Sequence, residues 1–121
     1  MKKILIVGAS SFIGKRLFEF LSLDFDVIGT GYSSRDFERV DINAPKDLEK
    51  FILDKKPDFI LWLSGKKDIE FCEKNPVESY EINIKSLHNL TNILINNNLK
   101  TKVIYPSSDR IFDGKKGNYT D

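Results

Sequence analysis

The chain has few cysteines, little net charge and only short apolar runs. Each of these absences excludes a class of protein. Its single cysteine, Cys72, excludes an internal disulfide and any metal site built from several cysteines, and it favours a reducing compartment. The 19 lysines and arginines nearly balance the 18 aspartates and glutamates, so we expect no nucleic acid and no anionic membrane as a partner. No apolar run is long enough for a signal peptide or a membrane span. These absences predict a cytoplasmic protein without a metal site.

The 121 residues do have the composition of one globular domain. Hydrophobic residues make up 40% of the chain and charged residues 31%, which is usual for a soluble domain with a single core. Short apolar runs alternate with segments of helical periodicity. This alternation predicts an α/β fold over residues 1–121, a Rossmann-type doubly wound parallel sheet of strand order 3-2-1-4-5 with helices on both faces.

Residues 2–14, KKILIVGASSFIG, predict a nucleotide-binding turn. An apolar run up to Val7 is typical of a strand buried on both faces, and a helical pattern follows the turn. Gly8 and Gly14 fit the spacing Gly-x-x-Gly-x-x-Gly, with Ser11 at the middle position, where its hydroxyl could also donate to a phosphate. Backbone N–H groups in such a turn bind the pyrophosphate of a dinucleotide. An ordinary strand-to-helix turn is also rich in small residues, so both interpretations stay open.

The end of the second predicted strand, residues 27–31, bears on the choice of cofactor. A carboxylate at this place binds the ribose 2′-hydroxyl of NAD, whereas hydroxyls and an arginine suit the 2′-phosphate of NADP. The chain carries Tyr32, Ser33 and Arg35 there. These residues favour NADP(H) over NAD(H). Asp36, close behind, could still bind the ribose, and a plain polar loop is the further alternative.

A second turn of small residues follows the predicted strand 59–63. Ser64 and Gly65 close that strand, as Gly8 closes the first one. Ligands of an open parallel sheet bind at the carboxyl ends of its strands, so we expect these three residues at one rim. Residues 66–75, which come next, are charged and are expected to be irregular.

A long helix is predicted to begin at Pro76. One of its sides carries an apolar stripe in which Asn83 is the polar member. A buried amide must be hydrogen-bonded, so Asn83 requires a partner such as backbone or water. The other members of the stripe are Tyr80, Leu87, Leu90 and Leu94.

These motifs occur together, in the same order and with the same gaps, in a known family. The chain resembles the amino-terminal, cofactor-binding half of an extended short-chain dehydrogenase/reductase, closest to the dTDP-4-dehydrorhamnose reductase type of nucleotide-sugar enzymes. The matching segments are GASSFIG (8–14), DI (41–42), KPDFILWLSG (56–65), DIEFCEKNP (68–76), EIN (81–83), SSDRIFDG (107–114) and GNYTD (117–121). The resemblance implies an NAD(P)-binding domain over residues 1–121.

The resemblance also implies roles for individual residues. The pyrophosphate loop would consist of Gly8, Ser11, Phe12, Ile13 and Gly14. Asp41 and Ile42 would flank the adenine. The nicotinamide ribose would be lined by Leu63, Ser64 and Gly65. Ser108 matches the catalytic serine or threonine that binds the substrate carbonyl or hydroxyl, and Asn83 matches an asparagine that supports the active-site helix.

A complete relative would transfer hydride from the nicotinamide to the 4-keto carbon of a nucleotide-linked sugar, as in dTDP-rhamnose biosynthesis. The tyrosine of a Tyr-x-x-x-Lys pair would protonate the oxyanion, and Ser108 would orient it. No tyrosine of this chain has a lysine four residues on. We therefore expect the chain to stop before that pair and before the substrate domain, and to be inactive as it stands. Trp62, where relatives carry histidine or asparagine, is expected only to pack against the sheet.

Three functions stay open at this point. The first is an NADP(H)-dependent reductase of a nucleotide-linked 4-keto sugar. The second is an epimerase or dehydratase of nucleotide sugars from the same superfamily. The third is a non-catalytic NADP-binding regulator, which the missing Tyr-x-x-x-Lys pair, Ser11 and Trp62 favour. The expected partner is a nucleotide-sugar substrate, and self-association is left open, a homodimer included.

Overall fold

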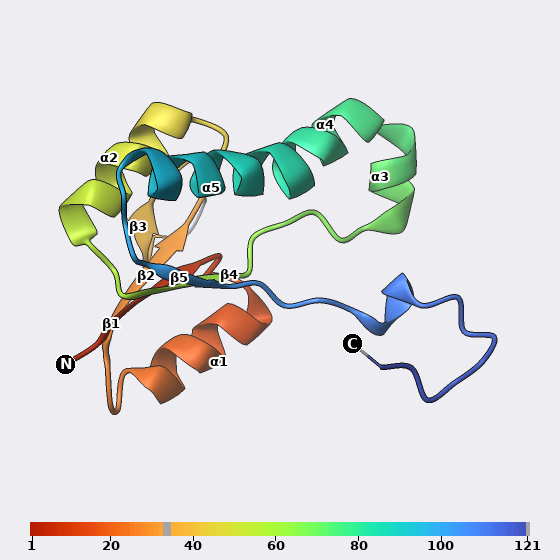
Figure 1. Cartoon of the computed structure of the whole chain (residues 1–121), viewed down its shortest axis with the longest axis horizontal. Coiled ribbons are helices and arrows are strands. Elements are labelled where there is room, and N and C mark those ends of the chain that lie inside the picture. Colours follow the sequence, from red (N-terminus) through yellow and green to blue (C-terminus); the bar gives the residue numbers. More distant parts are fainter. Residues whose placement is uncertain (33–34, 121) are drawn as a thin grey trace.

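A computed structural model describes residues 1–32 and 35–120 and shows a five-stranded parallel sheet between layers of helices (Figure 1). The strands are β1 (Lys3–Val7), β2 (Asp26–Gly31), β3 (Glu38–Arg39), β4 (Phe59–Trp62) and β5 (Lys102–Ile104). They lie in the order β3-β2-β1-β4-β5, and each neighbouring pair is parallel. The predicted Rossmann-type fold and its strand order are confirmed.

The helices lie on both faces of this sheet, as predicted. Helix α1 (Phe12–Leu21) covers one face, and α2 (Pro45–Lys55) and α5 (Ser86–Asn96) cover the other (Figure 1). The connection from β4 to α5 consists of α3 (Ile69–Lys74), α4 (Pro76–Tyr80) and the π-helical turn η1 (Glu81–Lys85). A short 3₁₀ turn, η2 (Asp109–Ile111), follows β5.

Strand β1 lies in the middle of the sheet because its side chains are apolar on both faces. Leu5 packs in a cluster with residues of α2 and α5, and Ile6 packs in a second cluster with residues of α1. Successive side chains of a strand point to opposite faces, so a strand that is covered on both sides needs an unbroken apolar run. Trp62 belongs to the first cluster and is 1% exposed, which confirms that its indole packs against the sheet.

The prediction of an irregular segment at 66–75 is wrong in part, because α3 forms within it. Asp68 is the N-cap of this helix, and its carboxylate accepts a hydrogen bond of 2.8 Å from the backbone N–H of Phe71. An aspartate in this position satisfies one of the N–H groups that the first turn of a helix leaves without a partner. The segment contains several other charged residues, so Asp68 did not stand out in the sequence as an N-cap.

The long helix begins at Pro76 as predicted, but its buried stripe begins later. Leu90 and Leu94 are buried, whereas Tyr80 is 54% exposed. The turn η1 separates these residues, and a π-helical turn contains more residues than an α-helical turn. A spacing of 3.6 residues therefore does not extend unchanged from Tyr80 to Leu90.

Among residues 1–32 and 35–120, no helix has the length and apolar character that crossing a bilayer requires. The same part of the chain contains no group of three or more histidine, cysteine, aspartate or glutamate residues placed to hold a metal ion.

Candidate functional site

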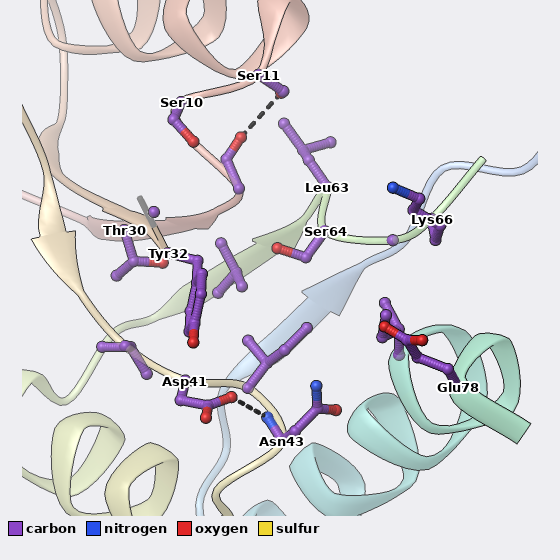
Figure 2. Close-up of a pocket in the computed structure, with 17 residues that line it drawn as sticks. Ser10, Ser11, Thr30, Tyr32, Asp41, Asn43, Leu63, Ser64, Lys66 and Glu78 are labelled. Atoms are coloured by element: carbon purple, nitrogen blue, oxygen red, sulfur yellow. Dashed lines mark hydrogen bonds between the residues drawn. The ribbon is translucent and has the colours of Figure 1, made fainter. Parts of the chain in front are cut away.

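A cavity of about 550 Å³ opens where β1, β2 and β4 end (Figure 2). Its walls come from the turns that follow these strands, from the segment 40–43 after β3, and from the helices α4 and η1. The predicted cofactor residues that line it are Gly8, Ser11, Tyr32, Asp41, Ile42, Leu63, Ser64 and Gly65. The shared rim expected from the strand ends is therefore present.

The turn after β1 passes close to both neighbouring strands. The N–H groups of Gly8 and Ala9 both donate to the carbonyl of Thr30 at the end of β2, at 3.1 and 2.8 Å. Gly8 has a φ of +94°, and a Cβ added to it would lie 2.9 Å from the backbone nitrogen of Ser64. A side chain at this position would be strained and would press on the β4 end of the cavity. The turn thus requires glycine for both its conformation and its packing.

Gly14 brings the first turn of α1 directly onto this loop. A Cβ at Gly14 would lie 2.3 Å from the carbonyl oxygen of Gly8 and 2.8 Å from the Cα of Ala9. Both contacts are with backbone, so Gly14 is needed for close packing and does not itself line the cavity. The first turn of a helix carries N–H groups without intrahelical partners and a positive partial charge. The start of α1 is therefore suited to an anion such as a pyrophosphate.

Ser11 serves this loop as a cap. It is the N-cap of α1, with φ −68°, so the position that the wider motif gives to glycine needs no left-handed conformation here. Its Oγ accepts from the N–H of Gly14 at 3.0 Å and donates to the carbonyl of Gly8 at 2.8 Å. The single hydroxyl proton is directed at Gly8. Ser11 thereby fastens the loop to the helix, and the donation of its hydroxyl to a phosphate stays a prediction.

Replacing Ser11 by alanine is expected to lower the free energy of unfolding by about 0.5–2 kcal/mol, because the N-cap bond to Gly14 is lost. Ser11→Gly is expected to cost less, roughly 0.3 kcal/mol. Urea denaturation measures both effects. Ser10→Ala is the matched control, because Ser10 is the neighbouring serine and does not cap the helix. Equal destabilisation by Ser10→Ala and Ser11→Ala would contradict the assignment.

Asn83 holds the segment that follows β4. Its side-chain Oδ1 accepts from the backbone N–H of Lys66 at 2.7 Å, and its Nδ2 donates to the carbonyl of Lys66 at 3.0 Å. The Nδ2 group also lies 3.3 Å from Oγ of Ser79, one turn earlier on the helix. The partner that the sequence required for this amide is therefore mainly backbone. Asn83 does not itself line the cavity, whereas Gly65 and Lys66, next to which it lies, do.

Replacing Asn83 by alanine is expected to free this segment and to cost about 1–3 kcal/mol of stability, because two backbone groups of Lys66 lose their partner. Amide hydrogen exchange of Lys66 is expected to accelerate by about tenfold or more. Asn83→Asp keeps an acceptor for the Lys66 N–H but loses the donor. In this variant the exchange rate of the Lys66 amide should lie between the rates in the unmodified protein and in Asn83→Ala. Asn92→Ala, at an exposed position of α5, is the control. An unchanged Lys66 exchange rate in Asn83→Ala would show that the amide does not hold the segment.

The remaining predicted site residues lie around the cavity or away from it. Phe12 and Ile13 are exposed on the first turn of α1, and Arg35 is exposed in the bend before β3. Ser33 lies outside the described residues. Ser108 is exposed in the segment after β5, where its Oγ accepts from the N–H of Arg110 at 3.2 Å. The structure does not bring Ser108 to the cavity wall, and its catalytic role stays a prediction.

Several lining residues were not selected from the sequence. Asn43 follows the predicted adenine-flanking pair, and its backbone N–H donates to the carboxylate of Asp41 at 2.9 Å (Figure 2). Glu78 comes from α4 and faces the cavity from the side opposite the glycine turn (Figure 2). No local pattern marks it, because it lies in a charged stretch of an exposed helix. The full set of such residues is Val7, Ser10, Thr30, Gly31, Val40, Asn43, Lys66, Glu78 and Ile82.

Two groups with shifted pKa values lie outside the cavity. A hydrogen bond to Glu38 raises the pKa of Lys55 above its ordinary value. A hydrogen bond from the hydroxyl of Tyr119 lowers the pKa of Asp113, and the backbone N–H of Lys115 acts in the same direction. Neither residue contributes to the walls of the cavity, so these shifts concern local structure.

The sheet order, the glycine turn that opens α1 and the cavity at the strand ends together define the class, a Rossmann-like α/β domain with its candidate site at the carboxyl ends of the strands. Within it, the chain belongs to the RmlD substrate binding domain family, which matches residues 1–121.

Two curated relatives are similar to this chain. GDP-6-deoxy-D-talose 4-dehydrogenase of Aggregatibacter actinomycetemcomitans is 30% identical over 99 residues, which is 80% of this chain and 32% of the relative. Methionine adenosyltransferase 2 subunit beta of Rattus norvegicus is 25% identical over 123 residues, which is 99% of this chain and 36% of the relative. The chain thus spans about a third of the length of these relatives.

Two solved structures resemble the whole fold. A hypothetical dTDP-4-dehydrorhamnose reductase from Sulfolobus tokodaii superposes with a TM-score of 0.88 at 31% identity, over 100% of this chain and 44% of that one. The dTDP-4-dehydrorhamnose reductase of Bacillus anthracis, in complex with NADP, superposes with a TM-score of 0.83 at 23% identity, over 97% of this chain and 40% of that one. The second likeness shows the fold alone.

Proposed function

We propose that this chain is the cofactor-binding part of an NADP(H)-dependent reductase that acts on a nucleotide-linked 4-keto sugar. The observation that carries the proposal is the cavity at the carboxyl ends of β1, β2 and β4. Membership of the RmlD family and the 31% identity to the Sulfolobus tokodaii protein support the reductase branch. Tyr32 and Arg35, which follow β2 in the sequence, favour NADP(H) as the cofactor.

The residues of the cavity fit a dinucleotide. Without a side chain, Gly8 lets the turn pack on the backbone of Leu63 and Ser64, at the rim where a pyrophosphate would lie. The N–H groups at the start of α1 would bind its negative charge. Asp41 and Ile42 would flank the adenine. At the other end, the nicotinamide ribose would lie against Leu63, Ser64 and Gly65.

The cofactor, when bound, supplies the hydride for a sugar carbonyl. The chain's own residues would bind the cofactor, orient the sugar carbonyl and exclude water. Ser108 would orient the carbonyl by a hydrogen bond to its oxygen, as the resemblance implies. No Tyr-x-x-x-Lys pair occurs in the 121 residues. We therefore assign to this chain cofactor binding and carbonyl orientation, and we do not assign to it the proton transfer to the oxyanion.

A second candidate function is that of a non-catalytic NADP-binding subunit. It is favoured by the 25% identity to a relative that is named as a subunit of methionine adenosyltransferase 2. In this function the cavity would bind the dinucleotide to stabilise the domain in a form that a partner protein recognises, and no hydride would be transferred.

Calorimetric titration with NADPH and with NADH tests the cofactor proposal. We expect both to bind and NADPH to bind more tightly, and the absence of binding by either would overturn the proposal. Oxidation of NADPH on addition of a 4-keto sugar nucleotide, measured with the protein as purified from its own cells, then separates the two functions. Oxidation supports the reductase, and binding without oxidation supports the subunit. An epimerase would interconvert sugar nucleotides without net loss of NADPH.

A further inference from the structure

We infer that Arg39, on β3, is the residue that selects NADP(H), by binding the 2′-phosphate of the adenosine ribose on a platform formed by Tyr32. This inference rests on the proposed function of the cavity. It assigns the phosphate contact to a residue that the sequence did not indicate, since the pattern after β2 pointed to Arg35.

Arg39 reaches the cavity through a ring that lines it. Tyr32 is the first residue after β2 and forms part of the cavity wall (Figure 2). Strand β3 is paired with β2 so that Arg39 lies beside Gly31. The Cζ atom of Arg39 lies 5.0 Å from the centroid of the Tyr32 ring, within the range of a cation–π contact. The contact holds the guanidinium beside a residue of the cavity wall.

The direction of the Arg39 side chain follows from the alternation along β3. The carboxylate of Glu38 lies 2.8 Å from Nζ of Lys55 on α2, so Glu38 points to the α2 face of the sheet. Phe37 packs edge-on against Phe18 of α1, with 5.1 Å between ring centroids. Successive residues of a strand alternate, so Arg39 shares the α1 face with Phe37.

The α1 face is also the side on which the glycine turn opens into its helix. A dinucleotide whose pyrophosphate lies at the start of α1 places its adenosine ribose toward the end of β2. Tyr32 and the guanidinium of Arg39 stand at that end. The geometry therefore puts a fixed cation next to the ribose hydroxyl that carries the extra phosphate in NADP.

The chemistry of the guanidinium suits this ligand. Its planar, forked N–H groups bind two oxygens of a phosphate at once, and it keeps its charge at any physiological pH. Stacking on an aromatic face leaves those N–H groups free at the edge of the plane. Arg35 is exposed in a bend and does not line the cavity. Arg39 does not line the cavity either, but it contacts the ring of Tyr32, which does, and this makes it the better placed of the two arginines.

The test compares Arg39→Gln with the matched variant Arg35→Gln, by calorimetric titration with NADPH, NADH and 2′,5′-ADP. In Arg39→Gln the affinity for NADPH and for 2′,5′-ADP is expected to fall by about tenfold to a hundredfold, because a charge-assisted contact is lost. The affinity for NADH is expected to stay within about twofold, because its ribose carries no phosphate for Arg39 to bind. Arg35→Gln is expected to change the affinity for NADPH less than Arg39→Gln does.

Two further variants address the platform and the fold. Tyr32→Phe keeps the aromatic ring and is expected to retain the preference for NADPH, whereas Tyr32→Ala is expected to lose most of it. Arg39→Lys replaces Arg39→Gln in the test if the latter does not fold. The lysine keeps a positive charge without the forked N–H groups of the guanidinium, so this variant is expected to retain part of the NADPH affinity. The unfolding midpoints of the ligand-free variants are measured alongside.

The outcomes separate this inference from the function on which it rests. If the unmodified protein binds neither NADPH nor NADH, the proposed function fails. If it binds both and Arg39→Gln leaves the ratio of the two affinities unchanged, the cofactor site stands and the inference is overturned. A larger loss of NADPH affinity in Arg35→Gln than in Arg39→Gln would likewise overturn it in favour of Arg35.

Discussion

Replacing Gly14 by valine is expected to abolish dinucleotide binding and to lower the free energy of unfolding by about 3 kcal/mol or more. The reason is the packing of α1 on the glycine turn. Even the first carbon of a side chain would lie 2.3 Å from the carbonyl oxygen of Gly8, far inside contact distance. The two nearest backbone atoms, the carbonyl oxygen of Gly8 and the Cα of Ala9, cannot rotate away as a side chain could. Either the helix or the turn must move, and both form the proposed pyrophosphate site.

The matched control is Lys15→Val, which introduces the same β-branched residue at the neighbouring, exposed position of α1. It is expected to cost less than about 1 kcal/mol, since only the helix propensity changes. Titration with NADPH measures binding, and urea denaturation measures stability. If Gly14→Val binds NADPH as tightly as the unmodified protein, the glycine turn is not the pyrophosphate site.

Replacing Trp62 by alanine is expected to lower the free energy of unfolding by about 3–5 kcal/mol, because it leaves a large cavity in the core. The indole is 1% exposed and packs in the cluster between the sheet and the helices α2 and α5. A domain of this size is stable by about 5–15 kcal/mol, so this single change would remove much of its stability.

Phe20→Ala is the control for Trp62→Ala, because Phe20 is also aromatic but is 67% exposed on α1. Its removal is expected to change the stability by less than about 1 kcal/mol. Trp62 is the only tryptophan of the chain, so the unfolding of the variants is followed by circular dichroism in place of fluorescence. Equal effects of the two substitutions would contradict the assignment of Trp62 to the core.

Much of the fold was predictable because local patterns carry it. The apolar runs at β1 and β4 marked strands covered on both faces, and the periodicity after Gly8 marked α1. Pro45 and Pro76 stand at the first positions of α2 and α4, where proline is tolerated, and both helices begin there. The prediction of an irregular segment at 66–75 was wrong in part, because the N-cap Asp68 of α3 stands among many other charged residues.

The site was predictable in part, for a different reason. Gly8, Ser64 and Asp41 follow strands, and strand ends of a parallel sheet share one rim, so their meeting followed from the fold class. Glu78 lies on α4, within a charged part of the chain, and no pattern in the sequence brought it to the same cavity. Ser11 was recognised as part of the loop, but its role as a cap depends on where its hydroxyl points.

The sequence alone determined which strands are buried on both faces and where the backbone needs glycine, because burial and steric exclusion act on each residue through its own side chain. Only the tertiary structure decided which distant side chains meet. Asn83 bonds to Lys66 across 17 residues of chain, and Arg39 stacks on Tyr32 because β3 pairs with β2 in one register. Register and crossover are properties of the assembled sheet, since they arise from packing energies summed over many residues.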